Sequence, residues 1–425
     1  MFQTLVKAFK IKEIRNKILI TLALIFVYRL GCYIPVPGVS IMTDMGNYNY
    51  LQIMSAVTGG ALQYGSLFAM GIGPYINSSI IVQLLSVGIP ALQNLSKQGE
   101  EGRRKLSNIT RYVTLLLAII QSIGILIGFS AAVDTTKIFN VYGDSQFLHV
   151  LSYIFLVAVY TAGAAVTMWI GERITDYGVS NGISMLIFAG ILATAGTAIT
   201  GMFTNFSLTG FWKLLGFAIA AVVIFAAIVT VDNAERKIPV QYAKQVKGRK
   251  LYGGSSTNIP IKVNASGVMP LIFAFALLSF PDLIINLIGM ETSWWTRNLG
   301  AGSWPYTIIM CALILFFAYF YQSMQFNPED ISKSIQGNGG FIPGIRPGKP
   351  TADHLKKISN RITLFGAIYL ALVALIPSIV FGFISTSLTG VFSATGLLII
   401  VSVALEFNQA LESQIMMKNY KGFLK

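Results

Sequence analysis

The sequence is poor in the residues that soluble enzymes use for chemistry. Its 425 residues include only two histidines, two cysteines and 17 acidic side chains. His149 and His354 have no cysteine or acidic partner at metal-ligand spacing. The glycine-rich stretch 337–340 is not followed by the Gly-Lys-Ser/Thr of a phosphate-binding loop. The sequence therefore predicts neither an enzyme nor a metal, nucleotide or other cofactor site.

Hydrophobic residues, in contrast, make up 54% of the chain and gather in about ten runs long enough to span a bilayer. This composition excludes a single soluble globular domain. It predicts an all-α polytopic membrane protein with ten transmembrane helices. The runs are 18–34, 74–89, 112–132, 147–170, 183–203, 211–231, 267–287, 305–326, 362–384 and 392–405.

Positive charge alternates along the gaps between these runs. Of the 31 Lys and Arg residues, 27 precede the first run, lie in every second gap or follow the last run. By the positive-inside rule, both termini and two long basic loops, at about 232–265 and 327–361, face the cytoplasm. Arg29 is a basic residue inside a run, near its outer end, so we expect a structural role in which the side chain snorkels or is paired.

The ten runs divide into two sets of five, residues 1–205 and 206–425. An odd number per set means that a structural repeat would be inverted. The second run of each set is interrupted: a glycine-rich stretch before Pro74 is expected to form a half-helix at about 59–70, and the seventh run contains Pro270 and Pro281. Matched interruptions indicate a central pathway. The alternative is that membrane helices simply tolerate Gly and Pro.

Isoleucines are the side chains available to line such a pathway. A ring of them would form a constriction that loses its water and stops ions without binding them. Composition alone explains the same residues equally well as ordinary packing. The candidates are Ile72, Ile76, Ile183, Ile187, Ile272 and Ile399.

Six stretches, in the right order over the full length, resemble the SecY family of bacterial protein-export channel subunits. They are 29–38, 59–76, 98–105, 178–184, 236–244 and 341–348. The resemblance implies two five-helix halves around an hourglass pore, with the six isoleucines as its ring. It also implies a plug at 59–70, with the positions Gly59, Gly60, Ala61, Leu62, Gly65, Ser66 and Leu67.

The resemblance further implies a lateral gate and docking sites. Asn77, Gln121 and Asn264 match the polar cluster of the gate, and we expect their amides to be satisfied across the helices when the gate is closed. The implied partners are the small subunits SecE and SecG, the motor SecA, the ribosome, signal sequences, unfolded polypeptides and lipid. The residues that match motor or ribosome sites are Arg236, Lys237, Lys244, Lys247, Arg249, Lys250 and Arg346.

The resulting hypothesis is a passive channel in the bacterial cytoplasmic membrane. It would export polypeptides, insert membrane proteins sideways, and be driven by an external motor or the ribosome. The alternatives are a secondary solute transporter with inverted repeats and a membrane scaffold without a pore. The shortage of carboxylates inside the runs and the two long basic loops favour the channel.

Overall fold

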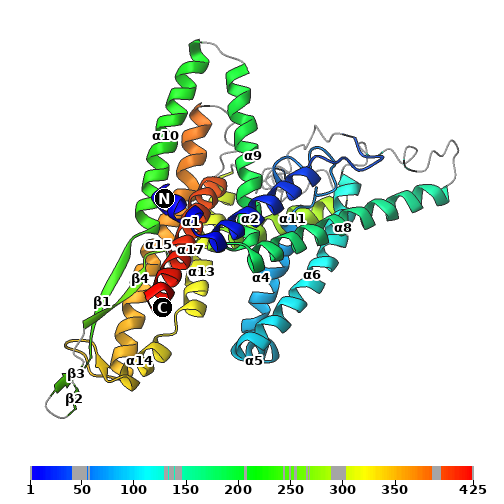
Figure 1. The fold of residues 1–425 in the computed structure, drawn as a ribbon. Helices are drawn as coiled ribbons and strands as arrows, with labels where there is room; N and C mark the ends of the chain where they lie inside the picture. Colours follow the sequence, from blue (N-terminus) through cyan, green and yellow to red (C-terminus); the bar gives the residue numbers. More distant parts are fainter. Residues whose placement is uncertain are drawn as a thin grey trace.

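A computed structural model describes residues 2–40, 55, 58–128, 133, 138, 146–204, 208–242, 245–247, 250–252, 256–264, 267, 269–288, 303–384 and 394–423. A helix lies at each of the ten predicted runs (Figure 1). In chain order these helices are α2 (Lys12–Gly31), α4 (Gly73–Gly88), α6 (Gly99–Gly128), α8 (Gln146–Tyr177), α9 (Gly182–Thr204), α10 (Leu208–Asp232), α11 (Met269–Ile288), α13 (Trp304–Gln325), α15 (Lys349–Ile384) and α17 (Ala394–Phe423).

Length and composition identify the membrane-crossing helices. Within the described residues, six helices could cross a membrane, and a seventh span is possible if α4 and α5 (Pro90–Lys97) count together. The α4–α5 pair is bent by 105°. Helix α11 runs through Pro281 without ending there, so its predicted interruption is a proline inside a continuous helix. The chain is therefore a multi-pass, all-α membrane protein.

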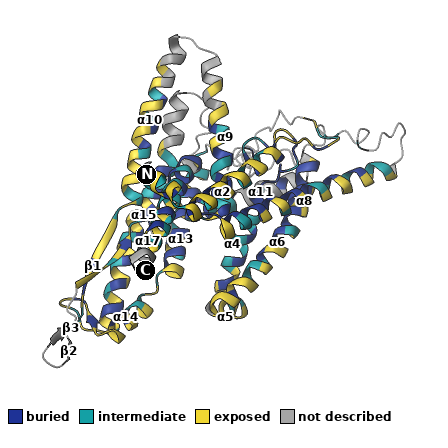
Figure 2. Cartoon of the chain, viewed as in Figure 1, coloured by how far each residue is buried: buried dark blue, intermediate teal, exposed yellow. Residues whose placement is uncertain are grey.

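Apolar side chains cover much of the outer surface. Figure 2 shows exposed positions along α10, and several are large and apolar, among them Ile219, Val222 and Val223. On α2, Phe26 and Leu30 are exposed in the same way. Such surfaces are favourable where the surrounding solvent is hydrocarbon.

Neighbouring helices pack mostly along the chain. Helix α6 packs between α4 and α8, α8 also contacts α9, and α13 packs between α11 and α15. Contacts of α6 with α11, of α9 with α17 and of α2 with α17 join the two sets of five helices. The short N-terminal helix α1 (Phe2–Lys10) rests on α17, where Ala8, Leu411 and Ile415 are buried together.

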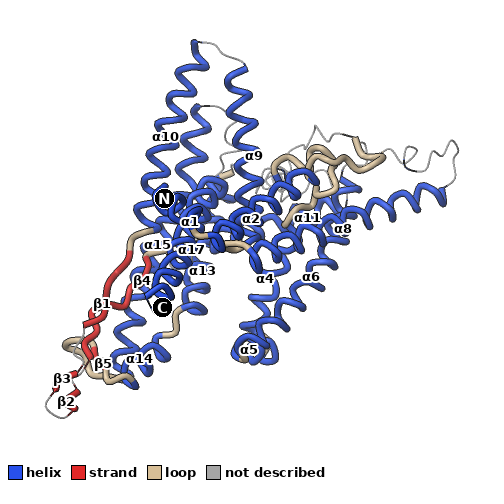
Figure 3. The backbone as a smooth tube through the Cα atoms, viewed as in Figure 1, coloured by secondary structure: helices blue, strands red, loops and turns tan. Residues whose placement is uncertain are grey.

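A small sheet stands at one end of the helices, and the sequence analysis did not predict it. Strands β1 (Glu235–Tyr242), β4 (Ser256–Lys262) and β5 (Gly340–Phe341) pair antiparallel in the order β4-β1-β5, and β2 (Gln245–Lys247) pairs with β3 (Lys250–Tyr252). Figure 3 shows the strands projecting from the helical body.

The sheet forms because β1 has apolar side chains at alternate positions, so that one face of the strand is buried and the other is exposed. Ile238 and Val240 are buried, whereas their neighbours are exposed. They pack with Ile261 and Ile342, and with Ile335 of α14 (Pro328–Gly337). The basic loop at 232–265 therefore contains a β-hairpin, and an apolar cluster packs this hairpin against α14 and α15.

Candidate functional site

The six candidate isoleucines lie in one hydrophobic cluster. They come from four places in the chain: the start of α4, the start of α9, α11 and α17. Ile72, Ile187 and Ile399 are buried, and the other three pack against them as partly buried side chains. The structure thus brings side chains from both predicted halves into contact at one point. We refer to Ile72, Ile76, Ile183, Ile187, Ile272 and Ile399 as the isoleucine cluster.

A cavity of about 440 Å³ opens beside the isoleucine cluster. Ile76, Ile183, Ile187 and Ile272 form part of its wall, and the rest is largely polar. We call this cavity the vestibule. Its polar and charged lining residues are Tyr75, Ser79, Gln83, Ser107, Arg111, Glu172, Thr175, Asp176, Asn181 and Ser184. A larger cavity, of about 740 Å³, lies between α13, α14 and α15 and is lined by none of the candidate site residues.

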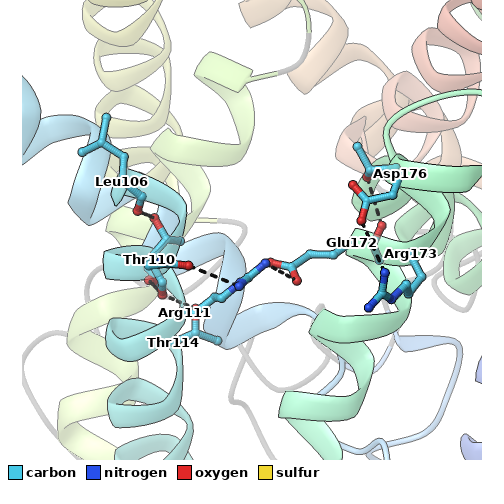
Figure 4. A network of polar contacts seen from close by, with 11 residues as sticks. Leu106, Thr110, Arg111, Thr114, Glu172, Arg173 and Asp176 are labelled. Atoms are coloured by element: carbon cyan, nitrogen blue, oxygen red, sulfur yellow. Dashed lines mark hydrogen bonds and ion pairs between the residues drawn. The ribbon is translucent and has the colours of Figure 1, made fainter. Parts of the chain in front are cut away.

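A two-point ion pair fixes the polar wall of the vestibule. Arg111 Nε lies 2.7 Å from Glu172 Oε1 and Arg111 Nη2 lies 2.9 Å from Glu172 Oε2, which joins α6 to α8 (Figure 4). At the preceding residue of α6, the Ser78 hydroxyl donates to the Thr110 carbonyl at 2.7 Å and links α4 to α6. Paired, planar geometry of this kind holds orientation as well as distance. These polar contacts hold helices α4, α6 and α8 together along one side of the vestibule.

The segment 59–70, which we call the plug segment, is not the half-helix that the sequence predicts. The structure shows turns from 59 to 72, apart from a β-bridge between Ser66 and Pro35. Gly59, Gly60 and Gly65 have φ angles of 69°, 86° and 54°, and Gly71 just after the segment has a φ of 50°. An α-helix needs negative φ at every residue, so three left-handed positions within 59–70 exclude one. The prediction of a half-helix is therefore wrong, because the glycines of this segment adopt left-handed turn conformations that a helix does not allow.

The plug segment packs directly against the isoleucine cluster. Ala61 and Phe68 are buried in that same hydrophobic cluster, and Leu67 packs against it. Leu62 is fully buried in the adjoining cluster. A Cβ on Gly163 of α8 would lie 2.0 Å from the Leu67 carbonyl oxygen, so the close approach of α8 to this segment requires glycine there. Gly59, Gly60 and Ser66 complete the predicted positions, with Ser66 buried.

The three predicted gate residues do not satisfy one another. Asn77 is half-buried on α4 and Gln121 is buried on α6. Asn264 Nδ2 donates to Asp232 Oδ1 at 2.8 Å, and Asp232 also accepts from Ser402 Oγ at 2.7 Å. Among the described residues, both amide atoms of Gln121 and Oδ1 of Asn264 are buried without a hydrogen-bond partner. The expected cross-helix amide network is therefore absent from the described part of the chain.

A different hydrogen bond crosses from α4 to α13. The Tyr321 hydroxyl donates to Gln83 Oε1 at 3.0 Å. The Tyr321 ring packs edge-on against Phe273 of α11, with ring centroids 5.3 Å apart. Sequence reasoning missed this contact because the two residues are 238 positions apart and belong to no motif.

The predicted docking residues on the β-hairpin have several environments. Arg236 and Lys237 are exposed on β1, and Lys237 Nζ lies 3.2 Å from Glu235 Oε1. Lys247 and Lys250 are paired positions on β2 and β3. Lys244 and Arg249 lie outside the described residues.

Arg346 lies exposed on a loop whose backbone is fixed. Turns on either side place Gly344 at φ 82° and Gly348 at φ 93°. Ile342 is buried under the sheet, and the Thr351 hydroxyl donates to the Arg346 carbonyl at 2.8 Å. The guanidinium is thus presented to the surroundings by a rigid loop.

Solved structures share the fold of this chain. One, described as the structure of a protein conducting channel, has a TM-score of 0.67 at 19% identity, covering 94% of this chain and 92% of that one. Canine Sec61 in a ribosome-channel complex has a TM-score of 0.62 at 17% identity, with the same coverage. Yeast Ssh1 bound to the 80S ribosome has a TM-score of 0.60 at 13% identity, covering 93% and 89%. The fold is that of the protein-conducting channels.

Sequence relatives then give the family. The SecY family model matches residues 66–408. The protein translocase subunit SecY of Streptomyces galbus is 41% identical over the whole of both chains. That of Staphylococcus epidermidis is 39% identical, covering 100% of this chain and 99% of the relative. This chain belongs to the SecY family.

Proposed function

We propose that this chain is a passive protein-conducting channel that exports unfolded polypeptides across the bacterial cytoplasmic membrane. The isoleucine cluster carries the proposal: residues from both halves meet between the polar vestibule and the plug segment. Apolar side chains at a constriction exclude water and so stop ions, yet they bind no particular side chain of a passenger. Family membership disfavours the solute transporter and the poreless scaffold.

The channel would work as two halves, residues 1–205 and 206–425, that separate about the α9–α10 connection. The seam between α4 and α6 on one side and α11 and α13 on the other would be the lateral gate, with Asn77, Gln121 and Asn264 along it. Through this gate, an apolar stretch of about twenty residues in the translocating polypeptide would move from the pore into lipid, because such a stretch is more favourable in hydrocarbon than in water. The unpartnered Gln121 amide supports this role, because a buried polar group without a partner destabilises the closed seam.

Partners would supply energy and substrates. We propose that SecA or the ribosome docks on the cytoplasmic residues Arg236, Lys237, Lys244, Lys247, Arg249, Lys250 and Arg346. The structural relatives in ribosome complexes support ribosome docking. SecE and SecG would complete the channel, and signal sequences would enter at the seam between the pore and lipid.

Orientation follows from the charge distribution and can be tested by labelling. In a variant without Cys32 and Cys311, we expect an impermeant thiol reagent added outside to label single cysteines at 137 and 213 and not one at 245. The reason is that 27 of 31 basic residues then lie on the cytoplasmic side. Permeabilised cells provide the control in which all three label. Labelling of 245 alone in intact cells would reverse the orientation.

Cross-linking tests the pathway itself. Cysteines replacing Ile76 and Ile187 should both form adducts with a secretory chain that is stalled during export, because both side chains line the vestibule next to the constriction. A cysteine at Phe365, which is 63% exposed on the outer face of α15, is the matched control and should form none. Equal cross-linking at all three positions, or none at 76 and 187, would contradict a path through the isoleucine cluster.

A further inference from the structure

Arg29, the basic residue inside the first apolar run, binds the backbone at the start of the plug segment. Its Nη1 donates to the Thr58 carbonyl at 3.3 Å and its Nη2 to the Gly59 carbonyl at 3.4 Å. Gly59 has φ 69°, and a Cβ there would lie 2.0 Å from Arg29 Nη1. Glycine at 59 therefore lets the guanidinium reach this backbone.

Aromatic side chains hold the plug segment against the same end of α2. Tyr28 stacks on Phe68, with centroids 5.9 Å apart and an angle of 12° between the rings. Tyr33 packs against Tyr64 at 5.8 Å, and the Arg29 guanidinium lies 5.4 Å from the centroid of the Tyr33 ring. These contacts place Arg29 among groups that all contact the plug segment.

Backbone hydrogen bonds also join the plug segment to the residues that follow α2. The Leu67 N–H donates to the Ile34 carbonyl at 2.9 Å, and the Val36 N–H donates to the Gly65 carbonyl at 3.0 Å. The residues that follow α2 thus bind the middle of the plug segment, whereas Arg29 binds its beginning. Each of these interactions is lost if the plug segment leaves.

Losing the plug segment would be most unfavourable for Arg29, because it is the charged group among those that contact this segment. A charged side chain at membrane depth is unfavourable unless polar groups surround it. In this structure the carbonyls of Thr58 and Gly59 provide such groups, together with the Tyr33 hydroxyl at 3.4 Å. Departure of the plug segment would remove both carbonyls from a charged group at once, whereas the aromatic rings and the backbone of Ile34 and Val36 would lose contacts between uncharged groups.

We propose that Arg29 is a positioning residue that latches the plug segment in the closed channel through the carbonyls of Thr58 and Gly59. The proposal rests on the proposed function, in which this segment closes the pore. The latch favours the closed state without entering the pore, and it must be broken each time a substrate opens the channel.

The test compares three variants of the complete channel in planar bilayers and in export assays. Arg29→Met removes charge and donors and should raise the open fraction of the resting channel by roughly tenfold, since hydrogen bonds to a charged group are lost. It should also speed export of a substrate with a shortened apolar signal. Arg29→Lys, a single-point donor, should restore part of the closure. Arg15→Met, at an exposed position of the same helix, should behave as wild type.

A second variant, Gly59→Ala, changes the plug segment at the position that Arg29 binds. Gly59→Ala should leak in the same way, and the double variant Arg29→Met/Gly59→Ala should leak no more than Arg29→Met alone, because both remove one interaction. Additive leaks would overturn the latch. If Arg29→Met fails to fold, Gly59→Ala decides. If deletion of residues 60–66 makes the channel leak but Arg29→Met and Gly59→Ala do not, the latch proposal is wrong and the plug segment still closes the pore. If none of these variants leaks, the proposal that the plug segment closes the pore is wrong.

Discussion

Replacing Arg346 with glutamate should nearly abolish motor-driven export while leaving the protein folded and inserted. The side chain is exposed, and the backbone carbonyl of Arg346 accepts a hydrogen bond from the Thr351 hydroxyl. Reversing the charge would place a carboxylate against the acidic or phosphate group of a docked partner. The rate should fall by at least about thirtyfold, since losing a buried charge pair at an interface costs about 2–5 kcal/mol.

Proteoliposomes with purified motor provide the measurement. Arg346→Lys should retain part of the activity, because lysine keeps the charge and loses the planar two-point donor. Lys357→Glu, a charge reversal at an exposed position of α15, is the control and should export normally. Wild-type rates for the glutamate variant, or an equal loss in the control, would leave Arg346 as a solvated loop charge.

Opening the constriction should make the resting membrane permeable to ions. Replacing Ile76 and Ile187 with serine puts small polar side chains where two members of the isoleucine cluster now pack, so water can wet the gap. Deleting residues 60–66 should have the same result, because the plug segment contributes Ala61 to that cluster. Both changes should turn a silent channel into a conducting one.

Single-channel recording in planar bilayers measures this directly. Leu372→Ser, at an exposed apolar position of α15 outside the cluster, serves as the control and should remain silent. A resting conductance that is the same in all variants would reduce the isoleucines to ordinary packing and remove the main support for the constriction.

Hydropathy and charge predict the ten helices because these properties are local. Each run of spanning length became a helix, with ends that moved by several residues, as in α8, which continues beyond 170 to Tyr177. The isoleucines could not be grouped in this way, since Ile72 and Ile399 are far apart in the chain and only the fold brings them together. For these residues the family resemblance supplied what periodicity could not.

Other features depend on conformation or on distant partners. Nothing in a run of glycines tells a half-helix from a series of turns until the φ angles are known. The β-hairpin was hidden because its alternating isoleucine and valine lie among many charges. The resemblance implies that Asn264 belongs to the gate, yet its amide donates to Asp232, which lies one residue beyond the run 211–231.

The Asp232 contacts have a mechanical meaning. The Val263 N–H donates to the Ala234 carbonyl at 2.9 Å, so the pairing of β1 with β4 continues to the base of the hairpin. There, Asp232 accepts hydrogen bonds from Asn264 and Ser402. Ser402 lies on α17 about one helical turn beyond Ile399. We expect the hairpin to act as a lever on α17, the helix that carries Ile399. A load applied to the hairpin would reach α17 through the two hydrogen bonds that Asp232 accepts, one from Asn264 and one from Ser402.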